Sequence, residues 1–155
     1  MGIALNEEVS ALLNDPETVK ALATVDRSGE PHVVFKGSFR VDAAGRLLYL
    51  ELIESSRTNN NLVHSLWFGR KVAINVARPA DGRSFQIKGL PIHCIISGPE
   101  FEQYYRQVRA ADPQADLSSV WVIQPEELRE ESYARRRQVE EAEHPLLLHL
   151  DRLAK

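Results

Sequence analysis

The sequence lacks the features that mark several classes of protein. It has one cysteine, Cys94, which excludes a disulfide within the chain and any zinc or iron–sulfur site that needs several cysteines. No run approaches the roughly 18 apolar residues of a membrane-spanning helix. The first residues also lack the basic and apolar segments of a secretory signal. We therefore expect a cytoplasmic protein that does not enter a membrane.

Neither sign of charge dominates the chain. The 19 Lys and Arg residues and the 22 Asp and Glu residues give a formal net charge of −3. A charge of this size does not draw nucleic acid or an acidic membrane to the whole surface, although it leaves room for a local basic pocket. The five histidines show no spacing typical of metal ligands, so no metal site is expected.

The residues that are present suit one folded domain with a tail. Apolar residues make up 43% of the 155 positions, which is enough for a core. The composition changes after residue 125, where opposite charges recur at i, i+4 spacing. We expect a β-rich domain over residues 1–125 and a helical extension over residues 126–155. The extension would pack on that domain or on a second subunit.

Six strands and several short helices are predicted from the periodicity of the apolar residues. Turns of Asp26–Glu30 and Asp42–Arg46 join the first three strands into an antiparallel meander. Gly89 and Pro91 mark a bulge or an edge in the fifth strand. The strands are expected at residues 19–25, 31–41, 47–53, 71–76, 84–97 and 117–124, and the helices at 6–13, 55–67, 99–108, 126–143 and after Pro145. This pattern predicts an α+β class with a barrel-like, mainly antiparallel sheet.

The segment Glu54–Asn61 joins the third strand to a helix and is crowded with hydrogen-bond donors. It holds three hydroxyls, one guanidinium and three amides. Unpaired N–H groups and a partial positive charge accumulate at a helix N-terminus. Ser56, Arg57 and Thr58 at this place predict an anion pocket that suits a phosphate. In the alternative interpretation, Ser55 or Ser56 only caps the helix and Arg57 is solvated.

Four segments follow one another in order along residues 19–124: ALATVDRSGEPHVVF, GRLLYLELIESSRTNNNL, GRKVAINV and a long strand that ends in ISGPEFEQYYRQ. Together they resemble the pyridoxamine 5′-phosphate oxidase-like FMN-binding split barrels, most closely the small bacterial FMN-binding proteins. The resemblance implies a six-stranded split β-barrel with peripheral helices. It also implies a homodimer with FMN in a groove between the two subunits, so residues 1–125 would form the FMN-binding domain.

The resemblance implies a set of cofactor-binding residues on three elements. The second strand would lie along the flavin, the end of the third strand would border the ring and the ribityl chain, and the donor-rich segment would bind the phosphate. An aromatic residue of the last strand would reach the ring from the partner subunit. The expected cofactor-binding residues are Val34, Phe35, Lys36, Glu51, Leu52, Ser56, Arg57, Thr58, Asn61 and Trp121.

Some of these residues have a plain structural alternative. Lys36 could point outward from its strand, and Trp121 could pack in the core or at a subunit interface. Glu51 could face solvent. A carboxylate beside the flavin would repel the negative charge that the ring gains on reduction and so lower the reduction potential of the flavin. Cys94 shares a strand face with Ile92 and Ile96, which predicts a buried and inert thiol.

The implied function is that of a flavin-dependent oxidoreductase acting on a small molecule or on NAD(P)H. The flavin carries the redox chemistry, so no catalytic side chain is predicted. The likeness does not extend to the vitamin B6 reaction, because the chain ends in a charged helix and a leucine helix where the oxidase has a basic, proline-containing motif. The alternatives are a non-enzymatic FMN electron carrier, the same fold with haem or a deazaflavin, and a structural barrel with a degenerate pocket. Only His32 is placed for a haem.

Overall fold

The computed structural model describes residues 1–145. The leucine helix expected after Pro145 lies outside the described residues. None of the described helices is long and apolar enough to cross a lipid bilayer. In chain order the elements are α1 (Glu7–Asn14), β1 (Val19–Val25), β2 (Pro31–Phe35), β3 (Arg40–Val41), β4 (Leu47–Glu51), α2 (Arg57–Phe68), β5 (Val72–Arg78), β6 (Arg83–Ile95), α3 (Pro99–Ala111), β7 (Ser119–Glu130) and α4 (Tyr133–Glu143).

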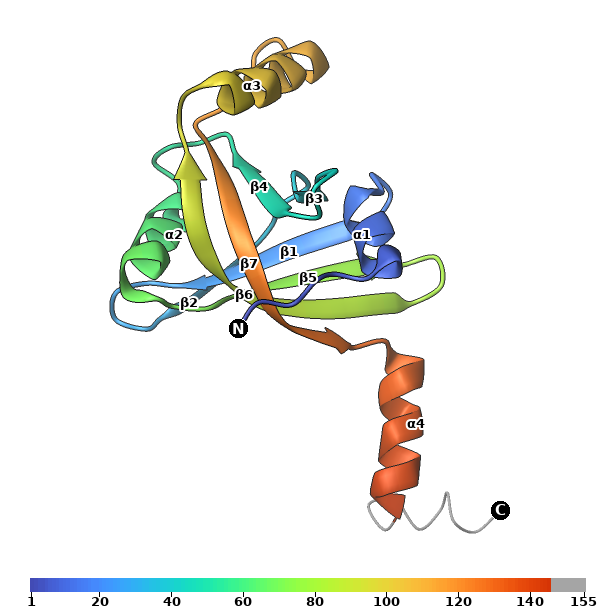
Figure 1. The fold of residues 1–155 in the computed structure, drawn as a ribbon. Coiled ribbons are helices and arrows are strands. Elements are labelled where there is room, and N and C mark those ends of the chain that lie inside the picture. Colours follow the sequence, from blue (N-terminus) through green and yellow to red (C-terminus); the bar gives the residue numbers. More distant parts are fainter. Residues whose placement is uncertain (146–155) are drawn as a thin grey trace.

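The strands form one antiparallel sheet in the order β2-β1-β5-β6-β7-β4-β3 (Figure 1). The predicted α+β class is confirmed, and each of the six predicted strands is present. The second one, expected over residues 31–41, is divided into β2 and β3. Because β2 pairs with β1 and β3 pairs with β4, this one segment reaches both edges of the sheet. The sheet therefore curls into an open barrel of seven strands instead of six.

Two turns with the sequence pattern Asp-x-x-Gly join β1 to β2 and β3 to β4. In the first turn, Asp26 Oδ1 accepts the N–H groups of Ser28 and Glu30, both at 2.9 Å. Gly29 has a φ of 87°, a conformation that favours glycine. Asp42 holds the second turn in the same way. These local contacts explain why both turns could be located from the sequence.

Strand β4 is buried on both faces because two cores meet at it. Leu47 and Tyr49 point into the main core inside the barrel, whereas Leu48 and Leu50 point into a second core that α3 covers. Helices α1 and α2 contribute to the main core and lie toward opposite ends of β1 (Figure 1). Glu51, the last residue of β4, follows the alternation and shares the inner face with Tyr49.

The helical extension begins later than the sequence pattern predicted. We expected a helix from Glu126, but β7 continues to Glu130 and pairs with β6 over this stretch. Helix α4 begins only at Tyr133, and none of its residues is buried. It projects away from the barrel (Figure 1). The first five residues of the predicted helix, 126–130, therefore belong to a strand.

The predicted bulge in the fifth strand is confirmed. The register between β6 and β7 shifts between Lys88 and Gly89 and again between Pro91 and His93. A Cβ atom at Gly89 would lie 2.4 Å from the main-chain oxygen of Gln124. A glycine at this position therefore lets the two strands approach each other closely.

The substitution Gly89→Ala is expected to lower the free energy of unfolding by about 1–3 kcal/mol, because the added methyl group must be forced into a packed site. Gly37→Ala is the matched control, since Gly37 is exposed and an added Cβ would meet no atom within 4 Å. Urea denaturation measures both variants. Equal losses of stability in the two would contradict the close approach at Gly89.

Candidate functional site

The N-terminus of α2 retains the features of an anion site. Ser56 caps the helix, and its Oγ accepts the N–H of Asn59 at 3.0 Å. Asn60 N donates to the main-chain oxygen of Ser56 at 3.1 Å. Among the described residues, the N–H groups of Arg57 and Thr58 have no acceptor. The first turn also contains no acidic residue, so the positive end of the helix is not neutralised there.

The predicted phosphate-binding residues differ in the exposure of their side chains. Arg57 is exposed and forms no ion pair within residues 1–145. Thr58 and Asn61 are buried, and Asn61 Nδ2 donates to Thr24 Oγ1 at 3.0 Å. This bond holds α2 against β1. Arg57 is thus the predicted residue whose charge is available to a ligand at the helix terminus.

Glu51 lies inside the barrel, and the expectation that it could face solvent is wrong. Its side chain is only 1% exposed. Tyr49 donates its phenol proton to Oε2 at 2.6 Å, and the N–H of Ile53 donates to Oε1 at 3.1 Å. Lys36 Nζ lies 3.9 Å from Oε1 and 5.8 Å from the centre of the Tyr49 ring. The two donors and one cation compensate the buried carboxylate.

Lys36 therefore does not point outward, and its neighbour on the strand does. Val34 in β2 and Lys36, the residue after β2, are half-buried on the inner side, whereas Val33 and Phe35 are 67% and 78% exposed. Successive residues of a strand point to opposite faces. The structure thus places Phe35 on a different face from Val34 and Lys36, so the three cannot line one surface of a ligand within a single subunit.

A cleft of about 680 Å³ opens beside α2, and Arg57 is not among the residues that line it. Of the predicted site residues, Leu52 and Trp121 line it. Its other walls come from the end of β4, from α2, from β6 and from the segment before β7, with the lining residues Ile53, Glu54, Asn59, Val63, Cys94, Ile96, Asp116, Leu117, Ser118 and Ser119. The lining includes two carboxylates and no Lys or Arg, so a phosphate would bind outside the cleft, at the helix N-terminus.

Asn59 was not singled out from the sequence, although it organises the floor of this cleft. Its Oδ1 accepts the indole N–H of Trp121 at 3.0 Å, and its Nδ2 donates to the main-chain oxygen of Glu54 at 2.9 Å. Trp121 is fully buried in the main core, as its structural alternative predicted. Asn59 and Val63 are four residues apart, so the sequence already indicated that they lie on the same face of the helix.

The predicted shared face of Ile92, Cys94 and Ile96 is wrong, because the bulge between Pro91 and His93 breaks the alternation and Cys94 lies opposite Trp121 on the main-core side. Ile92 and Ile96 are 49% and 68% exposed, and Cys94 is half-buried in the wall of the cleft. Burial raises the pKa of the Cys94 thiol. The thiol is therefore mainly protonated at neutral pH. Within residues 1–145, no three His, Cys, Asp or Glu side chains are grouped as a metal site requires.

Solved structures share this architecture. One from Lactobacillus delbrueckii, a candidate pyridoxamine 5′-phosphate oxidase, is 26% identical, with 81% of this chain and 93% of that chain covered and a TM-score of 0.60. An FMN-binding protein from Syntrophomonas wolfei is 16% identical, with 81% and 85% covered and a TM-score of 0.65. The chain has the pyridoxamine 5′-phosphate oxidase-like split-barrel fold.

The same split barrel occurs in proteins with other described ligands. HutZ, the haem storage protein of Vibrio cholerae, is 19% identical, with 83% of this chain and 95% of that chain covered and a TM-score of 0.58. An F420 reductase also has this fold. No protein-family model and no curated protein matches the sequence. The family resemblance drawn from the sequence is confirmed at the level of the fold.

The substitution Tyr49→Phe is expected to lower the free energy of unfolding by about 1–3 kcal/mol at neutral pH, because the buried Glu51 loses a donor. Burial and the hydrogen bond to Glu51 raise the pKa of Tyr49 above its ordinary value of 10.0. Above that pH the unfolded chain releases this proton while the folded protein keeps it. The wild type therefore loses stability as the pH rises through this range, and the variant should lose less.

Urea unfolding at neutral pH and at several alkaline pH values tests this expectation. Tyr133→Phe serves as the control, since the Tyr133 side chain is exposed on α4. Parallel pH dependences for wild type and Tyr49→Phe would show that the phenol is not held protonated by the fold.

Proposed function

We propose that this split barrel binds FMN and acts as a flavin-dependent oxidoreductase on a small molecule or on NAD(P)H. The observation that carries the proposal is the unneutralised N-terminus of α2, which offers the N–H groups of Arg57 and Thr58 together with the Arg57 side chain. The fold shared with an FMN-binding protein supports the view that the bound phosphate is that of a flavin mononucleotide. A non-enzymatic electron carrier with the same cofactor is the alternative.

The donor set at α2 fits a phosphomonoester. The helix has 12 residues, so its dipole is fully developed at the first turn. Two main-chain N–H groups and one guanidinium can each donate a charge-assisted hydrogen bond to phosphate oxygens. Ser56 contributes indirectly, because its cap fixes the direction of the first turn. In this proposal Arg57 and the backbone of Thr58 hold the phosphate.

The flavin supplies the electron transfer when it is bound, and the protein sets its surroundings. Lys36 and Glu51 lie on the inner side of the barrel wall as an ion pair with little net charge. Such a pair orients a neighbouring polar group without imposing the field of a free ammonium. The Tyr49 hydroxyl keeps Glu51 in place and leaves Lys36 free to donate from the remaining N–H bonds of its ammonium group.

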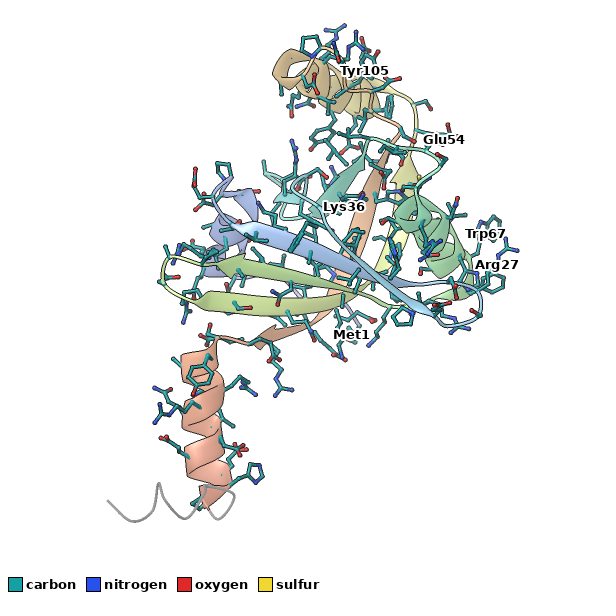
Figure 2. The ribbon with its side chains drawn as sticks, turned by 180° about the vertical axis from the view of Figure 1, so that it is seen from behind. Met1, Arg27, Lys36, Glu54, Trp67 and Tyr105 are labelled. Carbon is teal, nitrogen blue, oxygen red and sulfur yellow. The ribbon has the colours of Figure 1, made fainter. Side chains whose placement is uncertain are left out.

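We further propose that two copies of the chain form a homodimer with the cofactor between them. Helix α2 packs against β2, and both carry exposed apolar side chains. Figure 2 shows Trp67 on α2 beside the turn of β1 and β2 where Arg27 lies. Trp67 and Phe68 are 78% and 70% exposed, which is unusual for large apolar groups lying next to each other. A second copy would cover them and would bring the outward-facing Phe35 to a ligand.

Haem is the second candidate cofactor, favoured by the likeness to HutZ. In α2, the ring of His64 lies 4.7 Å from the ring of Phe68 at a tilt of 41°, and neither of its ring nitrogens has a hydrogen-bond partner among the described residues. The absorption spectrum of the purified protein separates the candidates, because flavin bands, a Soret band and a colourless solution are three different results. Consumption of NADH or NADPH by the flavin-loaded protein would then separate an enzyme from a carrier.

The substitution Arg57→Ala is expected to weaken FMN binding by about 1.5–3 kcal/mol, the size of a hydrogen bond to a charged group. Arg70→Ala is the matched control, because Arg70 is also exposed but lies beyond the C-terminal end of α2. Quenching of FMN fluorescence during titration measures both affinities. Equal FMN affinity in wild type and Arg57→Ala would defeat the proposed phosphate site.

Sedimentation equilibrium at micromolar concentration is expected to give twice the chain mass of 17.5 kDa. Trp67→Lys should shift the mass toward the monomer, because a charge at a covered apolar position is costly. Val19→Lys, at an exposed position of β1, should leave the dimer intact. A monomeric wild type would rule out the homodimer.

A further inference from the structure

Lys20 is a buried lysine whose ammonium group has a single acceptor among the described residues. It belongs to β1, and only 4% of the residue is exposed. Lys20 Nζ donates to the main-chain oxygen of Asp15 at 2.9 Å. The same oxygen already accepts the hydroxyl of Thr18 at 2.8 Å and its N–H at 3.3 Å. An ammonium has three N–H donors, and within residues 1–145 the one acceptor of Lys20 is shared.

Part of this arrangement has a structural explanation. Asp15 is the C-cap of α1, and a lysine at a helix C-terminus compensates the negative end of the helix. That role uses one donor of Lys20. Burial lowers the pKa of Lys20, and the positive charge of Arg40 acts in the same direction, whereas the Asp15 carboxylate acts against it. The fold therefore buries an ammonium group that loses its proton more readily than it would in water.

A cleft of about 490 Å³ opens onto Lys20. Asn14, Gly37, Phe39 and Arg40 line it together with apolar residues, and its lining contains no carboxylate. Two hydrogen bonds hold one wall of the cleft in place. Asn14 Oδ1 accepts the N–H of Val41 at 2.8 Å, and Asn14 Nδ2 donates to the main-chain oxygen of Val41 at 3.1 Å. These two bonds fix the end of α1 against β3.

Arg40 is the second cation of this cleft, and it forms no ion pair with an acidic side chain among the described residues. Its side chain donates to Gln107 Oε1 at 3.3 Å and, through Nε, to the main-chain oxygen of Ser38 at 3.5 Å. Its guanidinium lies 5.7 Å from the centre of the Tyr104 ring. These contacts orient Arg40 without neutralising it. Two like charges that share one cleft repel each other unless an anion lies between them.

We propose that this cleft is a binding site for a phosphate-type oxyanion, either the free ion or the phosphate group of a small metabolite. Lys20 supplies the ammonium donors that lack an acceptor, and Arg40 supplies a guanidinium, the pair of groups that suits a tetrahedral dianion. The cleft lies at the α1 end of β1, whereas α2 lies toward the other end (Figure 1). The proposal therefore does not depend on the FMN site.

Calorimetric titration with inorganic phosphate tests the proposal. The full-length chain carries Arg57→Ala, so that α2 does not contribute, and the ionic strength is constant. Saturable binding of one phosphate per chain is expected. Lys20→Met and Arg40→Gln should each weaken it about tenfold or more, as the loss of a charged hydrogen bond predicts. Arg27→Gln, in an exposed turn at the other end of β1, is the matched control and should bind as tightly as the parent.

Two further measurements separate a loss of phosphate binding from a loss of folding. Lys20→Met must retain a cooperative thermal transition, and if it does not, Arg40→Gln carries the comparison. In the wild type with ¹³C-methylated lysines, phosphate should raise the pKa of Lys20, which a merely structural lysine would not show. Phosphoserine in place of phosphate distinguishes the sources: equal affinity indicates the free ion, and tighter binding indicates a phosphorylated metabolite.

The proposal is wrong if millimolar phosphate gives no saturable heat, or if Lys20→Met and Arg40→Gln bind phosphate like the control. It can fail without the FMN proposal, since FMN binding should be the same in Lys20→Met and in wild type. Conversely, a loss of FMN binding in Lys20→Met but not in Arg57→Ala would show that the phosphate of FMN binds in this cleft. That result would refute the proposed phosphate site at α2.

Discussion

The split barrel depends on one segment, residues 31–41, that pairs with both edges of the sheet. Two hydrogen bonds hold its crossing: Lys36 N donates to the main-chain oxygen of Lys20 in β1 at 2.8 Å, and Ser38 Oγ donates to that of Leu50 in β4 at 2.7 Å. Phe39 then turns into the core and stacks on Tyr49, with ring centres 5.0 Å apart. The same crossing points Lys36 inward and opens the cleft above Lys20. The inward position of Lys36 and the cleft above Lys20 are thus consequences of how the sheet closes.

The sheet was largely predictable because its signals are local. Aspartate–glycine turns and alternating apolar residues give the six strands, and Gly89 gives the bulge. The break of the second strand at Lys36 was not predictable, because apolar residues continue on both sides of it and only the pairing with β4 decides where it bends. Residues 126–130 were misassigned for a similar reason. Most of them are charged and they directly precede the i, i+4 charge pairs of residues 131–141, so the pattern assigns them to the same helix. Glu127 and Arg129 nevertheless face solvent while Leu128 packs inward, and the ladder with β6 overrides the local preference.

The candidate site was predictable in its chemistry but not in its geometry. A hydroxyl cap followed by Arg57 identifies a helix terminus that suits an anion. Three asparagines follow in sequence. Only the packing of α2 shows that Asn61 donates a hydrogen bond to Thr24 of β1, whereas Asn59 lines the cleft and accepts one from Trp121. Likewise the strand around Cys94 has apolar residues on both faces, so the sequence could not show which face is covered. Buried polar contacts such as the one between Tyr49 and Glu51 join residues two apart, a spacing too common to carry a signal.

The order of the strands also constrains how the chain matures during synthesis. Strands β1 and β2 are neighbours in sequence and can pair early, but β4 lies against β7, where Leu47 is opposite Ile123. Until the ribosome has released β7, one side of β4 has no strand to pair with, and its buried Leu, Tyr and Glu side chains have no complete core to enter. Nascent chains of this protein therefore pass through a stage with an open hydrophobic ribbon, a state that chaperones bind and that self-associates when synthesis outpaces release.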